Sequence, residues 1–419
     1  MVGDVKSRCI TLGERVRDLL TKDATTRRAE RENAAARSLV RIAPVEARRL
    51  LRGASRALLL GAPDSASEEA LAGAARESLA QGMPVVVISE GVAGLGRALS
   101  RMGVGPVEVL DAYSHRYEPL ARRDAHDAAE LMEGAVSLCR DDAEGAGPYL
   151  EALAQVLALK RLPVSVRMMD GCPHSRMHEV IDRLESAGRV DAAEASDLRA
   201  RLDVSPSCRA AIQGFFREAV AEGRLLAGAG VTSSSCSIVD TVRRGGVTVL
   251  DVASGGNAAI CSLAFSEIEF CLRRGVALTV MVRARSLGRW ERLGELLRGF
   301  PAARWVISCD DALEFFSGTE QLRRWAASAD RLISFAQGHA SSDAVSELLG
   351  EYEKIDVSVS EAWEGSFWGL SGGVPGARSV TCSTRRERVV RPEELRSLGV
   401  GEFLVLERGE SGVCVGSVA

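Results

Sequence analysis

Aromatic residues make up only 5% of this 419-residue sequence, and lysine occurs just four times. The scarcity of aromatics disfavours a protein built around base-stacking platforms. No stretch reaches the roughly 18 consecutive apolar residues of a membrane-spanning helix, and no apolar segment follows the basic start as in a secretory signal. The sequence therefore predicts a cytoplasmic location.

The chain also lacks any CxxC pair, although it contains ten cysteines. We expect these cysteines to be small buried apolar residues that stay reduced, which agrees with the cytoplasm. The formal net charge of −4 disfavours a uniformly basic protein that coats DNA. Hydrophobic residues at 46% and charged residues at 26% are typical of a globular protein, and the length suggests two or three domains.

Positive charge is concentrated near the start of the chain. Residues 1–56 contain fourteen Lys or Arg side chains and only seven acidic ones. We predict an Arg-rich helical arm over residues 1–50 that could contact DNA, anionic lipid or an acidic partner. The other interpretation is a solvated helix held by ion pairs. The arginines concerned are Arg27, Arg28, Arg31, Arg48 and Arg49.

Short apolar runs alternate with helical stretches on both sides of a long helical region. This spacing requires crossover connections and predicts an α/β fold with a mainly parallel sheet. The expected strands are Ala57–Gly61, Met83–Ser89, Val107–Leu110, Val247–Val252, Ala277–Val282, Arg304–Ser308 and Arg331–Phe335.

Two further regions differ from this pattern. In residues 117–228 apolar residues recur at helical spacing and no strand is expected, which predicts an all-helical insertion into a core made of residues 51–116 and 229–419. Alternating residues near the C-terminus predict antiparallel strands at the edge of the sheet. These are Lys354–Ser360, Val380–Arg388 and Glu402–Val415.

The first expected strand runs into the sequence GAPDSASEE, where a phosphate-binding loop would lie in a P-loop fold. In the GxxxxGK[ST] pattern, Ala66 stands at the second glycine, Ser67 at the lysine and Glu68 at the Ser/Thr. A carboxylate here would repel a triphosphate, so we expect no cofactor, and tight binding of ATP with magnesium is improbable. The alternative is an ordinary turn capped by Asp64, Ser65 or Ser67. The residues of the degenerate loop are Gly61, Asp64, Ser65, Ala66, Ser67 and Glu68.

Two later strands end without the residues that hydrolysis requires. Where a Walker B strand would carry Asp-Glu to orient Mg²⁺ and the attacking water, the chain has Arg283 and Ala284. Cys309 follows the next strand, where a polar sensor of the γ-phosphate would stand. The coincident loss at three strand ends predicts absent catalysis.

The C-terminal third contains the stretch RLISFAQGHASSDAVSELLGEYE and then RPEELRSLGVGEFLVLERG. This block resembles the C-terminal part of the motor domain in TraG/TraD-type conjugative coupling ATPases, relatives of the FtsK/HerA translocases, and the likeness extends over residues 50–419. The resemblance implies a RecA-like P-loop-type core and a role in conjugation or DNA transfer. The family's nucleotide-binding Lys, Asp-Glu pair, sensor Gln and usual membrane spans are missing. The residues that do match the family's C-terminal pattern are Ser346, Leu349, Gly350, Glu353, Ser358, Ser360, Pro392, Glu393, Leu395, Leu398 and Gly401.

Two other groups of residues carry weaker hypotheses. In DGCPHSRMH, Cys172, His174 and His178 could bind zinc with Cys208 as a distant fourth ligand, but a Pro-started helix with surface histidines and no metal is the favoured interpretation. Trp363 and Trp368 could anchor a partner or cover the edge of the sheet.

Three functions follow from these patterns. The first is a non-hydrolysing pseudo-ATPase, similar to a type IV secretion coupling protein, that acts as a binding or assembly subunit beside an active coupling ATPase or in a homo-oligomeric ring. The second is an ATP-dependent DNA translocase whose lysine and acid come from unusual positions such as Lys160 and Glu90. The third is a nucleic-acid-binding module that acts through the N-terminal arm.

Overall fold

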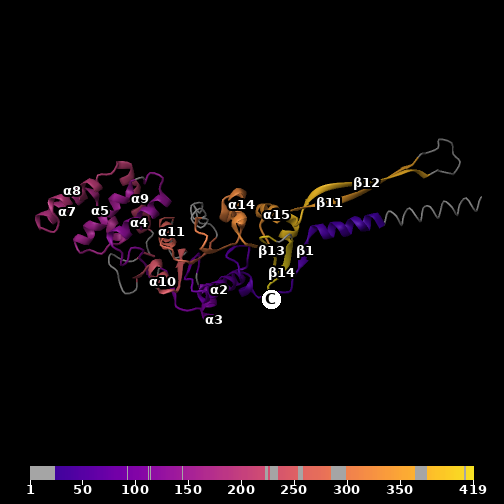
Figure 1. Cartoon of the computed structure of the whole chain (residues 1–419), viewed down its shortest axis with the longest axis horizontal. Helices are drawn as coiled ribbons and strands as arrows, with labels where there is room; N and C mark the ends of the chain where they lie inside the picture. The colour runs from indigo at the N-terminus through magenta and orange to yellow at the C-terminus, as the bar shows by residue number, and fades with distance from the viewer. Residues whose placement is uncertain are drawn as a thin grey trace, which may run out of the picture.

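The computed structural model describes residues 24–91, 93–111, 113, 115–143, 145–221, 225–226, 235–252, 258–284, 299–363, 375–409 and 412–419. Figure 1 shows an elongated molecule in three parts. A helical body lies at one end, an α/β body in the middle, and a long two-stranded ribbon extends from the other end beside the N-terminal helix.

The central body is built on a ten-stranded sheet in the order β1-β14-β13-β10-β2-β9-β8-β3-β7-β4. All strands from β10 to β4 run parallel, while β13 is antiparallel to both β10 and β14. This confirms the α/β class with a mainly parallel sheet and antiparallel strands near its edge. The strands are β1 (Leu39–Arg41), β2 (Arg56–Leu60), β3 (Val85–Ser89), β4 (Val107–Leu110), β7 (Val247–Asp251), β8 (Thr279–Arg283), β9 (Arg304–Cys309), β10 (Arg331–Ser334), β13 (Glu402–Glu407) and β14 (Val413–Ser417).

Helices cover both faces of this sheet, so each strand is apolar on both sides. In β2, Leu58 and Leu60 belong to one core and Ala57 and Leu59 to the other. Burial of each such leucine is worth about 2–3 kcal/mol relative to exposure. One face packs against η1 (Ala47–Arg49), α2 (Asp64–Ala80) and α3 (Ala93–Arg101). The other packs against α11 (Ala258–Arg273), α13 (Ala312–Phe316), α14 (Thr319–Ser328) and α15 (His339–Leu348).

The helical body is the predicted insertion. Two short strands, β5 (Arg116–Tyr117) and β6 (Ser235–Cys236), pair where the chain leaves and re-enters the α/β body, and α10 (Ile238–Arg244) follows β6. Its apolar helix faces share one core with α11, which joins the insertion to the sheet. The helices are α4 (Ala125–Cys139), α5 (Ala146–Leu159), α6 (Val166–Asp170), α7 (His174–Ser186), α8 (Ala192–Leu202) and α9 (Pro206–Ala221).

One part of the strand prediction is wrong. β11 (Glu351–Trp363) and β12 (Pro375–Arg388) pair with each other in a separate two-stranded sheet, and only Glu402–Val415 supplies antiparallel strands to the main sheet. Alternating apolar residues predict that a segment is a strand but not which strand it pairs with. We call the β11–β12 pair the ribbon.

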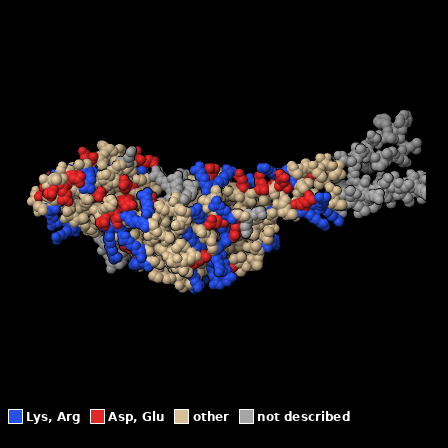
Figure 2. Space-filling model, viewed as in Figure 1, with Lys and Arg blue, Asp and Glu red and all other residues tan. Residues whose placement is uncertain are grey.

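The N-terminal region also differs from a single helical arm. The first helix covers residues 24–37, after which β1 joins the main sheet and η1 packs on α2, while residues 1–23 lie outside the described residues. Arg28 pairs with Glu32 at 2.8 Å, and Arg48 and Arg49 both pair with Glu46 at 2.9 Å. Figure 2 shows acidic and basic side chains interspersed over the visible face. Within the described part of the chain, no helix is both long and apolar enough to span a membrane.

Candidate functional site

The candidate site lies where the parallel strands end, at the start of α2. β9 lies between β2 and β8, so the degenerate loop after β2 and the last residue of β8 meet at this edge. The guanidinium of Arg283 donates to Asp64 Oδ1 at 2.6 Å and to Glu68 Oε1 at 3.3 Å. The Arg283 and Glu68 side chains are only 14% and 17% exposed. A cation from β8 is thus bound to two carboxylates at the start of α2, because residues 64–68 of the predicted loop are helical.

The serine at the lysine position of the pattern also has a partner within the protein. Ser67 is buried, and its hydroxyl shares a 2.7 Å hydrogen bond with Ser308 Oγ of β9. Cys309 is buried beside it, and burial raises the pKa of its thiol well above the ordinary value. The backbone carbonyl of Cys309 accepts a hydrogen bond from the Gly61 N–H at 2.8 Å. Neither Ser67 nor Cys309 therefore presents a free polar group to a ligand.

The remaining predicted residues have plainer roles. Ala66 and Ala284 are buried, and Ser65 is exposed. The predicted cap by Asp64, Ser65 or Ser67 is wrong, because Pro63 is the N-cap residue of α2 and no side chain caps it. Proline fits here because its fixed φ suits the start of a helix.

The end of β10 covers the loop, which sequence reasoning missed. Gly61 has φ +68°, and a Cβ at this position would lie 2.2 Å from Gln337 Nε2 and 2.4 Å from the carbonyl oxygen of Ala336. Gln337 Oε1 in turn accepts from the backbone N–H of Ala312, at the start of α13. The only feature of the sequence that could have indicated this role of Gln337 is its position just after a parallel strand, because such residues lie at the carboxyl edge of the sheet. Backbone and amide groups therefore closely cover Gly61, the first residue of the loop.

Gly94 of α3 makes room for the Glu68 carboxylate. A Cβ at Gly94 would lie 1.9 Å from Glu68 Oε1, whereas a Cβ at Gly96 in the same helix would meet nothing within 4 Å. Gly94→Ala should therefore push Glu68 away from Arg283.

We expect Gly94→Ala to be less stable than Gly96→Ala by about 1 kcal/mol, since only the first change displaces the Glu68 carboxylate, which lies at the end of a flexible side chain. Chemical denaturation of the two variants measures this difference. Equal stabilities would contradict the close approach of Glu68 to α3.

The weak metal hypothesis gains no support from the geometry. The rings of His174 and His178 lie edge to face with centroids 5.6 Å apart, and Tyr149 lies 6.0 Å from His174. Among the described residues, no group of three His, Cys, Asp or Glu side chains could hold a metal ion, so Cys172 does not complete a site with these two histidines. Trp368 and the side chain of Trp363 lie outside the described residues.

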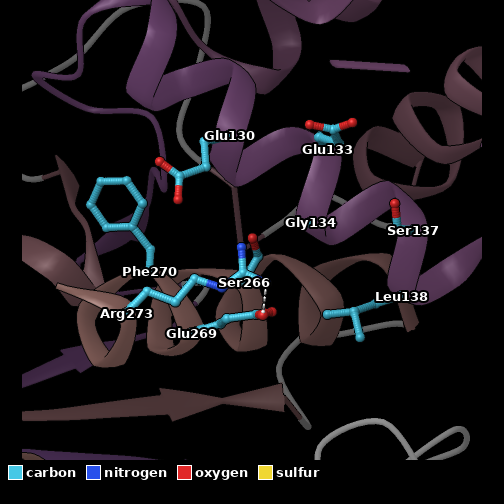
Figure 3. A pocket seen from close by; sticks show the side chains of 9 residues that line it. All are labelled: Glu130, Glu133, Gly134, Ser137, Leu138, Ser266, Glu269, Phe270 and Arg273. Carbon is cyan, nitrogen blue, oxygen red and sulfur yellow. Dashed lines mark ion pairs between the residues drawn. The ribbon is translucent and has the colours of Figure 1, made fainter. Parts of the chain in front are cut away.

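A cavity of about 350 Å³ lies between α4 and α11, away from the carboxyl edge of the sheet. Figure 3 shows Glu130 and Glu133 on one wall and Glu269, Phe270 and Arg273 on the other. Arg273 is already paired with Glu269. The cavity is lined by three glutamates among polar and apolar side chains and offers no arrangement of nucleophile and base.

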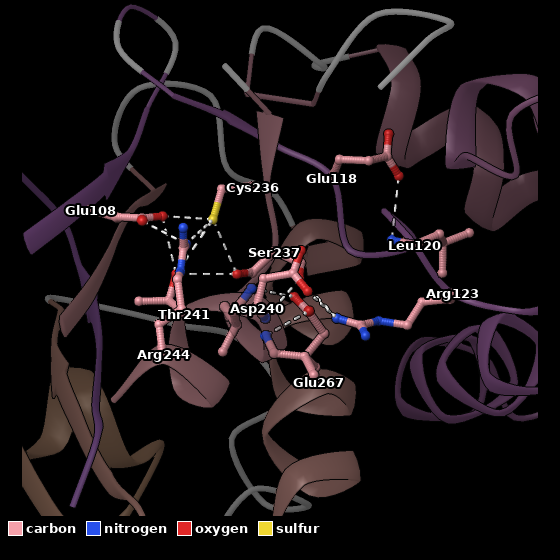
Figure 4. A network of polar contacts seen from close by, with 12 residues as sticks. Glu108, Glu118, Leu120, Arg123, Cys236, Ser237, Asp240, Thr241, Arg244 and Glu267 are labelled. Carbon is pink, nitrogen blue, oxygen red and sulfur yellow. Dashed lines mark hydrogen bonds and ion pairs between the residues drawn. The ribbon is translucent and has the colours of Figure 1, made fainter. Parts of the chain in front are cut away.

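A buried polar network joins the insertion to the sheet (Figure 4). Glu267 of α11 accepts hydrogen bonds from Tyr117 Oη at 2.7 Å and from the Val239 N–H at 3.1 Å, while Arg123 pairs with Asp240 at 3.0 Å. Burial raises the pKa of Glu267 to about 7 and that of Glu118 to about 8. Sequence reasoning missed this network, because its charged residues lie in stretches that look like ordinary amphipathic helices.

The same region holds a buried thiol that donates a hydrogen bond. Cys236 Sγ donates to Glu108 Oε2 at 2.6 Å, and burial together with this carboxylate raises the pKa of the thiol to about 11. Cys236 therefore serves as a hydrogen-bond donor between β6 and β4.

The C-terminal block that resembles coupling ATPases forms the base of the ribbon. Ser346 of α15 donates to the carbonyl of Val390, and the Gly350 carbonyl accepts from the Val389 N–H at 2.9 Å. Gly350 has φ +92°, a conformation that favours glycine, and Leu395 of α16 (Pro392–Arg396) is fully buried. These positions hold α15, the ribbon and α16 together.

Comparison with known proteins agrees with this fold. The unbound monoclinic form of the bacterial conjugative coupling protein TrwBΔN70 matches with a TM-score of 0.54 and 16% identity over 87% of this chain and 84% of that chain. TrwB bound to the GTP analogue GDPNP gives 0.53 and 15% identity, and TrwB with ADP and Mg²⁺ gives 0.51 and 16%, each over 87% of this chain and 85% of that chain. No family model matches the chain. No curated protein matches it either.

The structural neighbours confirm the predicted resemblance at the level of the fold. The chain has a RecA-like P-loop-type core with a helical insertion, and a coupling protein is among the solved structures that share it.

Proposed function

We propose that this chain is a non-hydrolysing binding or assembly subunit of a conjugative DNA-transfer system. The contact of Arg283 with Asp64 and Glu68 carries this proposal. The likeness in fold to TrwB, a conjugative coupling protein, supports the conjugation context. In this role the fold would serve as a rigid body that joins an active coupling ATPase or further copies of itself.

The chemistry of the loop supports the non-hydrolysing part. A P-loop holds a triphosphate with free backbone amides, an ammonium group and a hydroxyl for Mg²⁺. Here the nearby cation is already bound to two carboxylates and the Ser67 hydroxyl is bound to Ser308. A triphosphate would have to separate Glu68 from Arg283 and then lie beside a partly buried carboxylate. We infer that neither ATP nor magnesium binds at residues 61–68.

The alternative functions have less support. Lys160 is the C-cap residue of α5, and α5 and α2 lie in different bodies of the molecule in Figure 1. Glu90 does lie at the carboxyl edge, since its N–H donates to the carbonyl of Arg283 at 2.9 Å. In the N-terminal region, ion pairs with glutamates already neutralise Arg28, Arg48 and Arg49.

Equilibrium titration with a fluorescent ATP analogue and magnesium, together with a sensitive phosphate-release assay, tests the proposal. We expect no saturable binding at micromolar nucleotide and no turnover above background. An active coupling ATPase in the same buffer provides the positive control. Micromolar affinity that depends on residues 61–68, or turnover near about one per second, would overturn the non-hydrolysing assignment.

A further inference from the structure

The two edges of the ribbon differ, because a helix covers the edge of β11 and no strand pairs with the edge of β12 among the described residues. The side chain of Asn33 donates from Nδ2 to the carbonyl oxygen of Ile355 at 2.9 Å and accepts from the Ile355 N–H at 2.7 Å. One amide side chain thus occupies both backbone groups that Ile355 turns away from β12. The helix of residues 24–37 therefore covers the outer edge of β11, which prevents another strand from pairing there.

The register of the ribbon places free backbone groups on the opposite edge. Ile355 is paired with Thr384, and because the Ile355 backbone points outward, the N–H and C=O of Thr384 also point outward, at the edge of β12. The period of two extends this orientation to Cys382 and Val380. Among the described residues β12 pairs with β11 alone, so these groups have no strand partner.

The middle of this edge lacks the features that usually prevent strand pairing, although β12 begins at Pro375 and ends with the charged residues 385–388. Residues 380–384, with the sequence VTCST, contain no proline and no charged side chain. Val380 is 49% exposed, and Cys382 and Thr384 are exposed. Figure 1 shows the ribbon extending away from the α/β body, which leaves space for a second strand along β12.

We propose that β12 pairs antiparallel with β12 of a second copy of this chain, centred near Cys382, to form a four-stranded sheet. In this register Val380 of one copy faces Thr384 of the other and no charges face each other between residues 380 and 384, whereas Arg386 would face Arg378, which restricts the pairing to this short uncharged segment. Ile355, Val357, Val380 and Cys382 share one face of the ribbon and would form a continuous apolar strip in the larger sheet. A two-fold contact of this kind uses the same strand on both copies, unlike the head-to-tail contact of a ring.

The position of Cys382 makes the pairing testable in the full chain. We expect a concentration-dependent dimer by sedimentation, and a short bismaleimide should cross-link Cys382 of one copy to Cys382 of the other, identified by mass spectrometry. Cys382→Thr keeps the outward N–H and should dimerise normally without the cross-link. Cys382→Pro removes that N–H from both copies, while the bonds to β11 remain, and should weaken the dimer at least about tenfold.

Several outcomes would overturn this inference. A chain that stays monomeric at the highest concentration measured would do so, as would equal dimerisation of Cys382→Pro and Cys382→Thr. A dimer that cross-links only through other cysteines would place the contact elsewhere. Matching circular dichroism spectra of the two variants, at a concentration where both are monomeric, verify that the proline leaves the fold intact. Because these measurements involve no nucleotide, their result is independent of the proposed non-hydrolysing function.

Discussion

Replacing Arg283 with alanine is expected to lower the free energy of unfolding by about 3 kcal/mol. The change leaves the Glu68 carboxylate, which is 17% exposed, without its cation in a site with little water. Removal of one partner from a buried ion pair costs more than the pair itself contributes, because the remaining charge stays desolvated. Asp64 adds little to this effect, since its side chain is 76% exposed and water screens its contact. Denaturant unfolding monitored by circular dichroism measures the change.

A double-mutant cycle separates the ion pair from general damage. We expect Glu68→Gln to reduce the cost of Arg283→Ala by about 1–2 kcal/mol, because the neutral amide does not need the cation. Asp64→Asn is the matched control at the exposed partner and should couple to Arg283 by less than about 1 kcal/mol. A cycle in which Glu68 couples no more strongly than Asp64 would show that Arg283 does not hold the loop through Glu68.

Raising the pH from 5 to 8 should destabilise the natural chain more than the Glu118→Gln variant, by about 3 kcal/mol. Burial raises the pKa of Glu118 to about 8 in the folded protein from the ordinary value of 4.5. The unfolded chain therefore loses its proton near pH 4.5 while the folded chain keeps it until pH 8. Stability is fully present below the lower pKa and is lost as the pH rises through this window. Glutamine does not ionise, so the free energy of unfolding of the variant lacks this pH-dependent contribution.

Unfolding free energies of both proteins at several pH values test this expectation. The difference between them should grow steadily from pH 5 and become constant above pH 8. Glu30→Gln, at an exposed position of the N-terminal helix, should change stability by less than about 0.5 kcal/mol at every pH. Parallel pH curves for the natural chain and Glu118→Gln would contradict a protonated Glu118 in the folded state.

The parallel strands were the most predictable part of the fold. β3 and β8 are buried on both faces, so their sequences are continuous apolar runs, and the observed ends lie within two residues of the predicted ones. The meeting of the degenerate loop with the end of β8 was also predictable, since the carboxyl ends of parallel strands lie at one edge.

Long-range partners were not predictable from one sequence. Arg283 and Glu68 are 215 residues apart, and nothing local in either segment indicates the other. For the same reason, the sequence did not predict the contacts of the ribbon or the buried polar network that joins the insertion to the sheet. Asn33 contacts Ile355 across 322 residues, and Tyr117 contacts Glu267 across 150. Residue type and spacing predict local structure, whereas these contacts depend on how distant elements pack.

The order of strands in the sheet has a consequence for synthesis on the ribosome. β2 lies between β9 and β10, so its neighbours are residues 304–309 and 331–334. After residues 61–68 have been synthesised, some 240 further residues must follow before β2 can pair with its first neighbour, β9. At ordinary elongation rates of about 5–20 residues per second, this takes tens of seconds. The helical insertion emerges in that interval, and its mostly local contacts let it form before the centre of the sheet can close.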